Sequence, residues 1–432
     1  MKTKKQKTKK LKNISAVTLA ALLTLSIAGC SKAAVSSGAA VAATQTASQA
    51  VSSNTSSADS ATTSTSSTSE ASTTSAADAS TTDTTQLFSD RDLEQSADLT
   101  AATQMKLVSN QDVTLSEEGV YVLSGDVENV TVTVDAAAED AKVQIVLDGV
   151  SITNDDSPAI YVKAADKVFV TSTDSENQME VTGSYVADGE TNLDAVIFSK
   201  ADITLNGPGT LAIVSTQGNG ISSKDDLKIT GGVYTIKSAA DAMEANDSIL
   251  INDGTVTIDT DKDALHSENA DDAALGNIYI EGGTLNINAA DDAITANNLV
   301  QIDGGTINIE TSVEGIEANN IIVNDGQITL YASDDGINAT PKINEDASIV
   351  VNGGTIKVSM GSGDTDAFDA NGDIAINGGT INVEATSAFD ADGTAQLNGG
   401  DVTVNGEKIT EITVSRMGGG GQGGAGGGKR GH

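Results

Sequence analysis

A repeat of about 22 residues in the second half of the chain constrains the fold more than any other feature of the sequence. Each copy carries a glycine pair, or a single glycine in the weaker copies, followed by a run in which apolar and polar residues alternate, as in residues 282–288. The second glycine or its equivalent lies at positions 232, 254, 283, 305, 326, 354, 379 and 400. Most of the steps are 21 or 22 residues long, and the longest is 29. Such a period with a few longer members indicates a solenoid with loop insertions.

Three short segments within one copy predict strands. Residues 284–288 and 299–302 alternate between apolar and polar side chains, and residues 292–297 form a third segment of mixed pattern between them. The repeat shows no 3.6-residue period and lacks the Leu-x-x-Leu-x-Leu frame of a leucine-rich repeat. The sequence therefore predicts an all-β fold, a parallel β-helix whose coils stack about 4.8 Å apart. A single coil could not bury its apolar face, so the coils must form one continuous solenoid.

Residues 107–209 show longer and less regular strand patterns, as in residues 130–134 and 143–147, separated by turn signals such as Asp148-Gly149. Terminal repeats of a solenoid are atypical, so we interpret this region as an irregular N-terminal cap with the early coils. Together with the regular repeats in residues 210–405, it forms one domain predicted to span residues 87–417.

The N-terminus has the features of a secretory signal. Residues 1–29 contain seven lysines and no acid, and the lysines precede the apolar residues 14–28. Residues 27–30, Ile-Ala-Gly-Cys, look like a bacterial lipobox, which predicts cleavage before Cys30 and lipidation of its thiol. The acyl chains would attach the protein to the outer face of the bacterial cell membrane. An ordinary signal peptide with an incidental cysteine is the alternative.

Composition divides the remaining chain. Residues 30–86 consist almost entirely of Ser, Thr and Ala, which predicts a disordered stalk, and the Gly-rich residues 418–432 predict a flexible tail. The net charge is −37, and without the seven lysines 17 basic residues face 61 acidic ones. Such a surface repels nucleic acid and attracts cations, so we expect no nucleic-acid partner.

Several motifs resemble a known family. Residues 147–154 (LDGVSITN), 158–168 (PAIYVKAADKV), 205–211 (LNGPGTL) and 223–232 (SKDDLKITGG) are similar to those of bacterial carbohydrate-binding-domain lipoproteins. These are secreted β-helix proteins related in fold to calcium-dependent pectate lyases, and the resemblance covers about residues 105–405. It implies a right-handed parallel β-helix, bound Ca²⁺, and binding of acidic or cellulosic polysaccharide without demonstrated cleavage. Its motifs do not define individual ligand residues.

Oxygen-bearing side chains recur in columns when the repeats are aligned. The first column comprises Asn219, Asp241, Asp263, Asp292, Glu314, Asp335, Asp366 and Ser387. The second, three residues later, comprises Ser222, Glu244, His266, Thr295, Glu317, Asn338, Asp369 and Asp390. A third, five residues after the first, includes Asn246, Glu268, Asn297, Asn319, Asn371 and Asp392. Between the first two lies an apolar column that we expect to point into the core, namely Ile221, Met243, Leu265, Ile294, Ile316, Ile337, Phe368 and Phe389.

The acidic columns predict cation binding. Two carboxylates about 5 Å apart repel each other by roughly 3 kcal/mol at an effective dielectric constant of about 20. Ca²⁺ would offset this repulsion and accepts six to eight oxygen ligands in flexible geometry. The predicted clusters join Asp241 with Glu244 and Asp263, Asp291 with Asp292 and Glu314, and Asp364 with Asp366, Asp369 and Asp390. The complete set of predicted ligands is Asp241, Glu244, Asp263, Asp291, Asp292, Glu314, Glu317, Asp335, Asp364, Asp366, Asp369 and Asp390. The alternative is that these are solvated turn residues and side-chain ladders.

The sequence gives only weak signals of catalysis. A uronate lyase needs a base, and Lys262 and His266 beside Asp263 are the most suggestive of the lysines and histidines in the repeats, but a lone Lys or His on a solenoid face is usually solvated. Asp334-Asp335 resembles the paired aspartates of polygalacturonases, but the accompanying Gly-His-Gly and Arg-x-Lys signatures are missing. We therefore predict no catalytic residues.

The aromatic content bears on the kind of glycan. Trp is absent and aromatic residues make up 3% of the chain, which argues against an aromatic platform for crystalline cellulose. The sequence predicts a cell-surface lipoprotein that binds Ca²⁺ and polysaccharide, acidic, pectin-like or cellulosic, without turnover. A calcium-dependent lyase acting on uronate polymers and a surface adhesin or structural spacer remain the alternatives.

Overall fold

The computed structural model describes residues 82, 87–138, 140–363 and 365–414. The predicted signal peptide with Cys30, nearly all of the predicted stalk, the Gly-rich tail and the predicted ligand Asp364 lie outside the described residues. All described residues belong to the compact unit Ser72–His432. Within them, no helix has the length and apolar character needed to cross a membrane.

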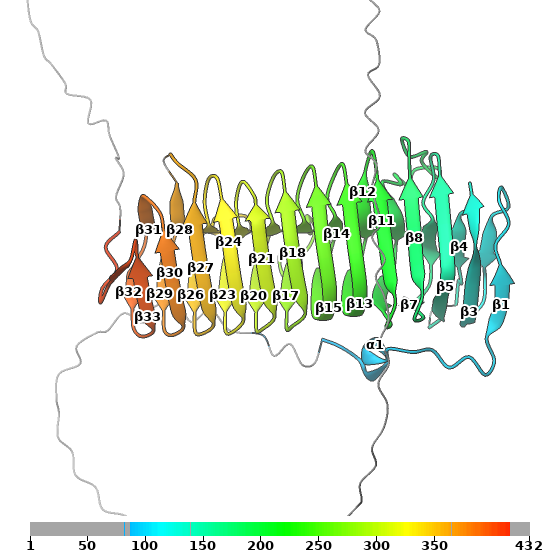
Figure 1. Ribbon diagram of the computed structural model, residues 1–432, viewed down its shortest axis with the longest axis horizontal. Coiled ribbons are helices and arrows are strands. Elements are labelled where there is room, and N and C mark those ends of the chain that lie inside the picture. The colour runs from blue at the N-terminus through cyan, green and yellow to red at the C-terminus, as the bar shows by residue number, and fades with distance from the viewer. Residues whose placement is uncertain (1–81, 83–86, 139, 364, 415–432) are drawn as a thin grey trace, which may run out of the picture. The chain divides into compact units, whose positions relative to one another are not determined.

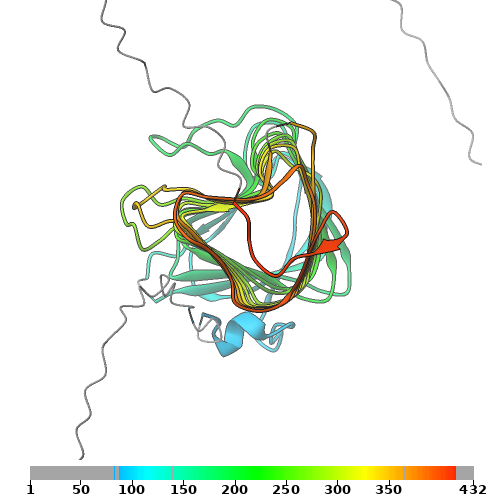
Figure 2. The ribbon, with the colours of Figure 1, turned by 90° about the vertical axis from the view of Figure 1, so that its left-hand side faces the viewer.

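The described residues form a parallel β-solenoid, as predicted (Figure 1). The described part of the chain contains one short helix, α1 (Asp90–Leu93), and otherwise strands. Nearly all strand pairs are parallel, and each coil adds one strand to each of three ladders, which form the three sides visible along the axis (Figure 2). We call these ladders A, B and C.

Ladder A is a separate sheet with one strand from each of 12 coils. Its strands are β2 (Val113–Leu115), β4 (Val132–Asp135), β6 (Ile160–Ala164), β9 (Ala195–Ser199), β12 (Asn219–Ser223), β14 (Met243–Ala245), β16 (Leu265–Ser267), β19 (Ile294–Ala296), β22 (Ile316–Ala318), β25 (Ile337–Ala339), β28 (Asp366–Ala370) and β31 (Ser387–Ala391).

Ladders B and C belong to one sheet, because four long strands (β3, β5, β13 and β15) run through the corner between them. Ladder B contains β1 (Thr103–Lys106), β3 (Gly119–Glu128), β5 (Lys142–Asn154), β7 (Lys167–Ser172), β10 (Asp202–Asn206), β13 (Asp226–Ser238), β15 (Ser248–Thr260), β17 (Asn277–Ile280), β20 (Leu299–Ile302), β23 (Asn320–Val323), β26 (Ser348–Val351), β29 (Asp373–Ile376) and β32 (Ala395–Leu397).

Ladder C contains the second halves of the four long strands and the strands that follow the glycine turns. These are β8 (Glu176–Val181), β11 (Thr210–Ser215), β18 (Thr284–Ala289), β21 (Thr306–Thr311), β24 (Gln327–Ala332), β27 (Thr355–Met360), β30 (Thr380–Glu384) and β33 (Asp401–Val404). At the C-terminal end, β34 (Glu407–Lys408) pairs antiparallel with β33.

The repeated glycine pair makes the corner between ladders B and C. Gly283 has φ +80° and Gly305 has φ +86°, in the left-handed region that side chains disfavour. The glycine before each of them packs against the preceding coil, because a Cβ on Gly282 would lie 2.5 Å from the Asn252 carbonyl oxygen. Both positions therefore require glycine, which explains the period of the sequence.

The core is a set of in-register apolar rows inside the solenoid. Each member of the predicted inward column of ladder A is at most 1% exposed, so that prediction is confirmed. Its last two members, Phe368 and Phe389, are paired in register and stack with their ring centroids 5.3 Å apart.

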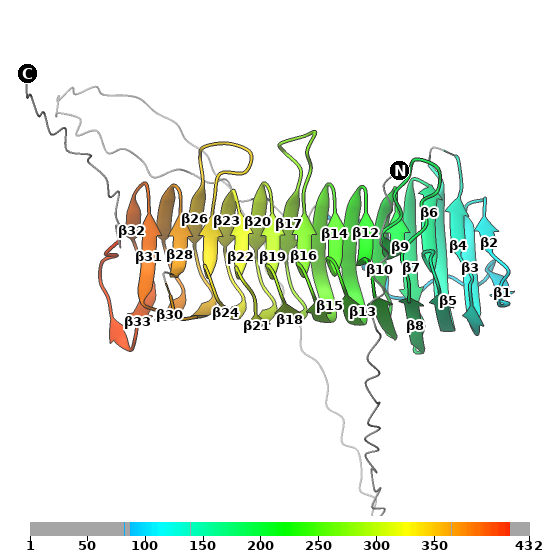
Figure 3. The ribbon, with the colours of Figure 1, turned by 90° about the horizontal axis from the view of Figure 1, so that it is seen from above.

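Two insertions account for the two longest repeat steps. Insertion 1 (residues 268–276) follows β16, and insertion 2 (residues 340–347) follows β25. Both leave the solenoid at the corner between ladders A and B, and Figure 3 shows them projecting beyond the neighbouring coils at the same edge.

A segment before the first strand crosses the outside of ladder B, and we call residues 87–95 the strap. Phe88 packs against Leu250 and Tyr279, and α1 lies outside the solenoid (Figure 1). The Asp92 carboxylate accepts from the Lys167 ammonium at 2.7 Å and from Thr204 Oγ1 at 2.6 Å. The strap therefore ties several coils together along the solenoid axis.

The strap contacts extend into the predicted stalk. The backbone N–H of Thr82 donates to Gln301 Oε1, and Gln301 Nε2 donates to the Thr82 carbonyl, both at 2.8 Å. Gln301 belongs to β20, three coils beyond the β13 strand that the strap also contacts. The chain is thus held against ladder B at Thr82 as well.

Candidate metal centre and adjoining cleft

The second sequence column forms a continuous outward row on ladder A. Its eight members, from Ser222 to Asp390, are direct register partners in successive strands. The register confirms the predicted alignment and places neighbouring side chains one strand spacing apart, about 4.8 Å.

The first column connects the backbones of successive coils. The N–H of Asp292 donates to Asp263 Oδ1 at 3.0 Å, and the N–H of Glu314 donates to Asp292 Oδ1 at 3.0 Å. The same bond joins Asp366 to Asp335, also at 3.0 Å. One oxygen of each of these carboxylates therefore takes part in a side-chain ladder, which was the alternative to cation binding. The second oxygen of each carboxylate is not used by these backbone bonds, and the carboxylates lie beside the second column.

Carboxylates converge in three places among the described residues. The three groups, each with ligand atoms within 4.8 Å of one another, are Asp241 with Asp263 and His266, Asp263 with Asp291 and Asp292, and Asp292 with Glu314 and Glu317. We call the last group the Glu314 cluster. The described predicted ligands that join none of these groups are Glu244, Asp335, Asp366, Asp369 and Asp390.

The chain itself supplies cations at the Asp241 end. The Lys262 ammonium lies 2.9 Å from Asp241 Oδ1 and 3.6 Å from Asp263 Oδ2, and His266 Nδ1 lies 3.0 Å from Asp241 Oδ2. Burial raises the pKa of Asp241, but His266 and Lys262 more than offset it, so the pKa lies below its usual value. Glu244 accepts from the Asn219 amide at 2.6 Å. Two members of the predicted Asp241–Glu244–Asp263 cluster, Asp241 and Asp263, thus converge with His266 in a group that Lys262 partly neutralises.

The Glu314 cluster brings three carboxyl groups together with one cation, the Lys342 ammonium at Glu317. Burial, followed by the charges of Glu317 and Asp292, raises the pKa of Glu314 to about 8. Burial and the neighbouring carboxylates Asp263, Glu317 and Asp291 likewise raise the pKa of Asp292 to about 7. The raised pKa values reflect burial first and then repulsion between neighbouring carboxylates, both of which oppose ionisation.

Asn338 lies beside the Glu314 cluster and has a buried oxygen. Its Nδ2 donates to Glu314 Oε2 at 3.1 Å, while its Oδ1 is buried and has no hydrogen-bond donor among the described residues. The residue is 7% exposed. An acceptor oxygen left without a donor costs about 1–3 kcal/mol, and a bound cation would satisfy it. Carboxylate and amide oxygens together are the donor set that Ca²⁺ prefers.

Acidic charge also gathers further along the row. Burial, followed by the charges of Asp335, Asp366, Asp390 and Asp392, raises the pKa of Asp369 to about 7. These residues belonged to the third predicted cluster or to its neighbouring coils, and they repel one another as expected. The described carboxylates do not converge there as they do in the Glu314 cluster.

A cleft lies between the bases of the two insertions, and we call it the insertion cleft. It has a volume of about 350 Å³ and is lined by His266, Glu268, Thr295, Ala296, Asn297, Glu317, Thr340 and Lys342. Glu317 therefore belongs both to the Glu314 cluster and to the cleft wall. A second depression of about 650 Å³ shares His266 and Glu268 and continues to Lys224. The two depressions follow ladder A beside the carboxylates.

The third sequence column fixes both insertions. Asn297 Nδ2 donates to the Asn269 carbonyl of insertion 1 at 3.1 Å. The fully buried Asn319 accepts from three backbone N–H groups of insertion 2, those of residues 342, 343 and 344, at 3.1–3.2 Å. These contacts hold the cleft walls on the rigid solenoid.

Sequence reasoning did not assign Asn338 or Lys342 to the site, and it considered His266 only as a base. Asn338 and His266 stood in the second column, so the register already placed them beside the predicted ligands. Lys342 lies in an insertion, which the repeat alignment does not cover, so no signal in the repeats pointed to it.

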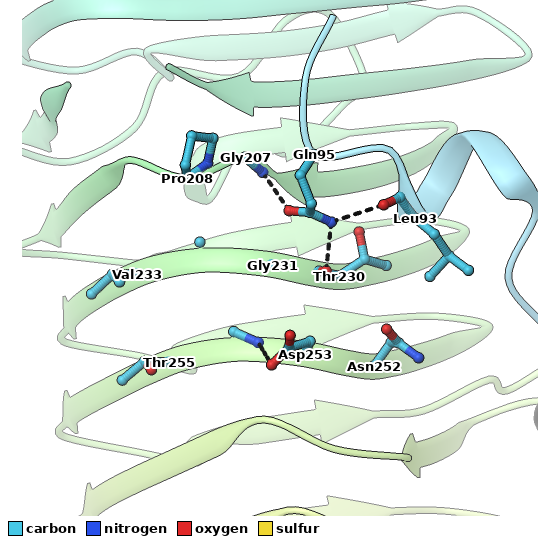
Figure 4. Close-up of a pocket in the computed structure, with 12 residues that line it drawn as sticks. Leu93, Gln95, Gly207, Pro208, Thr230, Gly231, Val233, Asn252, Asp253 and Thr255 are labelled. Carbon is cyan, nitrogen blue, oxygen red and sulfur yellow. Dashed lines mark hydrogen bonds between the residues drawn. The ribbon is translucent and has the colours of Figure 1, made fainter. Parts of the chain in front are cut away.

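Another crevice, of about 520 Å³, lies between the strap and ladder B (Figure 4). Gln95 enters it, accepting from the Gly207 N–H at 3.0 Å and donating to the Thr230 carbonyl at 2.8 Å. A Cβ on Gly231 would lie 1.9 Å from Gln95 Oε1, so glycine makes room for this side chain. The crevice is where the strap docks, and the acidic groups of ladder A lie elsewhere.

Three comparisons place the chain among known proteins. The family model described as carbohydrate-binding domain-containing protein matches residues 109–367. A carbohydrate-binding domain-containing protein of Acetivibrio thermocellus is 37% identical over 134 residues, which cover 30% of this chain and 46% of the relative. The chain thus spans about half the length of that relative. A solved polysaccharide lyase-like protein from C. thermocellum, a gadolinium derivative, has a TM-score of 0.42 and 24% identity, covering 68% of this chain and 99% of that chain.

Proposed function

The chain belongs to the family of carbohydrate-binding domain-containing proteins, and we propose that it binds Ca²⁺ at the Glu314 cluster and an acidic polysaccharide in the insertion cleft, without cleaving it. We further propose that Cys30 carries a lipid anchor that holds the protein at the outer face of the bacterial cell membrane. The Glu314 cluster carries the first proposal, and the lipobox-like residues 27–30 carry the second.

The observation that carries calcium binding is the convergence of three carboxyl groups, with one lysine paired to Glu317, beside a buried acceptor. Asp292, Glu314 and Glu317 supply carboxylate oxygens, and Asn338 supplies an amide oxygen that has no donor among the described residues. Hard oxygen ligands in a flexible arrangement suit Ca²⁺ better than Mg²⁺, which demands stricter octahedral geometry.

Calcium also explains how an acidic protein could bind an acidic polymer. The net charge of −37 repels a polyuronate, and screening by salt removes only the long-range part of that repulsion. A divalent ion at the edge of the insertion cleft supplies positive charge where the sugar carboxylates would lie. Glu317 connects the two regions, because it belongs to both.

The states of the candidate bases favour binding over cleavage. Burial lowers the pKa of His266, but the adjacent Asp241 and Asp263 carboxylates more than offset it, so the pKa lies above its usual value. Asp241 and Asp263 likewise raise the pKa of Lys262 against the opposing effect of burial. Groups held in their protonated, ion-paired forms are poor bases for abstracting a sugar proton.

The proposal is tested by titrating polygalacturonate into the full chain in millimolar Ca²⁺ and in EDTA. We expect binding only with Ca²⁺, loss of that binding in Glu314→Gln combined with Asp292→Asn, and normal binding in Asp259→Asn. Asp259 is an exposed carboxylate of ladder C, paired with Lys237, so its replacement controls for the loss of a carboxylate away from the Glu314 cluster. Equal binding in EDTA would refute the role of calcium. A rise in ultraviolet absorbance from unsaturated uronates would show turnover and refute a binding-only role.

A further inference from the structure

Lys342 lies at the boundary between the Glu314 cluster and the insertion cleft. Its ammonium donates to Thr295 Oγ1 at 3.2 Å and to the Glu317 carboxylate. Its side chain also lines the cleft, and it is 26% exposed against 14% for the Glu317 side chain. One ammonium group therefore faces both the carboxylates of the cluster and the space proposed for the sugar.

The backbone of Lys342 is fixed while its ammonium is not. The buried Asn319 side chain accepts the Lys342 N–H at 3.1 Å, and its amide donates to the Asp346 carbonyl at 3.1 Å. The ammonium, in contrast, is held by two partly buried side-chain contacts at the end of four methylene groups. A flexible stem on a fixed base lets the charge move while the insertion stays in place.

A divalent cation and this ammonium cannot both remain at Glu317 without cost. The ligand atoms of the cluster lie within 4.8 Å of one another, so an ion held by them and a lysine on one of them are like charges at close range. Their repulsion in a half-buried site is several times larger than in water. Binding of the ion therefore displaces the ammonium, and the insertion cleft is the space that its side chain already lines.

We propose that Lys342 is a tethered cation that competes with Ca²⁺ for Glu317 and, once displaced, binds a carboxylate of the sugar in the insertion cleft. The inference rests on the proposed function and adds that Ca²⁺ binding precedes and promotes binding of the sugar by Lys342. Calcium turns the lysine from an internal partner into a ligand-binding group, so calcium and acidic sugar reinforce each other. This coupling is reciprocal, as linkage requires.

If Lys342 competes with Ca²⁺, its removal should change the affinities for Ca²⁺ and for the sugar in opposite directions. Lys342→Met removes the competitor and should raise the affinity for Ca²⁺ roughly fivefold, the upper range for one partly exposed ion pair. The same change removes a contact to the sugar and should lower the affinity for a galacturonate oligomer, measured in saturating Ca²⁺, roughly tenfold. A lysine that merely supports the fold of insertion 2 would affect both affinities in the same direction.

The experiment is calorimetric titration of the full chain and three variants, first with Ca²⁺ alone and then with galacturonate oligomer in saturating Ca²⁺. Lys342→Arg keeps the charge and should behave like the wild type in both titrations. Lys357→Met removes the same charge from ladder C, where Lys357 is exposed and lies 3.6 Å from Glu384, and should change neither affinity appreciably.

Two outcomes would overturn the inference while leaving the proposed function intact. One is unchanged or weaker Ca²⁺ binding by Lys342→Met in a protein whose wild type binds Ca²⁺. The other is tighter Ca²⁺ binding with unchanged sugar binding, which would remove the recognition role. A wild type that binds no Ca²⁺ would refute the proposed function itself, and the inference with it.

Discussion

Replacing Lys167 by methionine removes one half of a buried ion pair that fixes the strap to the solenoid. The ammonium lies 2.7 Å from Asp92 Oδ1, and the two side chains are 10% and 1% exposed. Asp92 also accepts from the Ser89 backbone N–H at 2.8 Å and from Thr204 Oγ1 at 2.6 Å. Methionine retains most of the apolar stem, so the variant chiefly removes the charge.

The expected cost follows from leaving a buried carboxylate without its cation. Breaking a buried pair costs about 3–5 kcal/mol. Burial raises the pKa of Asp92, but Lys167, Thr204 and Ser89 more than offset it and hold the pKa at about 2, so the net effect favours the ionised form by about 2 kcal/mol. Undocking of the strap limits the loss, since Asp92 would then be hydrated. We expect Lys167→Met to lower the free energy of unfolding by about 3 kcal/mol.

The matched control is Lys163→Met, four residues earlier. Lys163 lies 2.9 Å from Asp188, but the two side chains are 45% and 44% exposed, so this pair should contribute less than about 1 kcal/mol. Urea unfolding of both variants gives the comparison. Trypsin cleavage after Arg91, whose guanidinium lies 4.4 Å from the Phe169 ring centroid, reports strap release and should accelerate only in Lys167→Met. Equal unfolding midpoints, or a destabilised protein in which Arg91 stays protected, would refute the reasoning.

Three further predictions concern the core and the carboxylates. Asp292 and Glu314 have raised pKa values, so their contribution to stability is fully present below about pH 4 and is lost as the pH rises through 7 and 8. In EDTA, the free energy of unfolding should therefore fall by about 2 kcal/mol between pH 5 and 9, a value that allows for solvent screening. Adding Ca²⁺ at pH 9 should restore it. A pH-independent midpoint would contradict this. Tyr234→Phe should raise the free energy of unfolding by about 1 kcal/mol, because the buried Tyr234 hydroxyl has no hydrogen-bond partner among the described residues. Tyr185→Phe removes a hydrogen bond to Ser215 and should lower it, so urea titration distinguishes the signs. Gly283→Ala places a Cβ 2.8 Å from a carbonyl oxygen at φ +80° and should cost about 2 kcal/mol, and an unchanged thermal midpoint would show that the turn can relax.

The solenoid and its outward row could be predicted because they repeat. Glycine turns such as those at Gly283 and Gly305 recur with a period that determines which residues stack. Alignment of the repeats therefore predicts from the sequence that Glu317 lies opposite Thr295 and Asn338, as the structure shows. Register in a parallel ladder then follows from the apolar rows inside, because a shift by one residue would expose them.

The strap and the insertions could not be predicted in the same way. Asp92 meets Thr204 across 112 residues, and the contact belongs to no repeated unit. Lys342 reaches Thr295 across 47 residues from an insertion that the alignment leaves out. Such contacts depend on where a non-repeating segment folds back onto the ladder, and no periodic pattern encodes that position.

The sequence columns do not reveal that Asp241 and Glu314 have different numbers of basic neighbours. From the alignment, Asp241 and Glu314 look equivalent, because both belong to the first column. In the structure, Lys262 and His266 approach Asp241, whereas the pKa of Glu314 is raised to about 8. Two basic side chains reach the Asp241 end, whereas the Glu314 cluster has Lys342 at Glu317, and spacing alone does not reveal this difference.

The most direct test of the central claim is calorimetric titration of Ca²⁺ into the full chain at pH 7 in two buffers of different ionisation enthalpy. Carboxylates with raised pKa values must lose protons to bind a metal ion, so the account predicts Ca²⁺ binding with net proton release, abolished in Glu314→Gln. Binding heats that are the same in both buffers, or Ca²⁺ binding that survives in Glu314→Gln, would contradict the assignment of the Glu314 cluster as the calcium site.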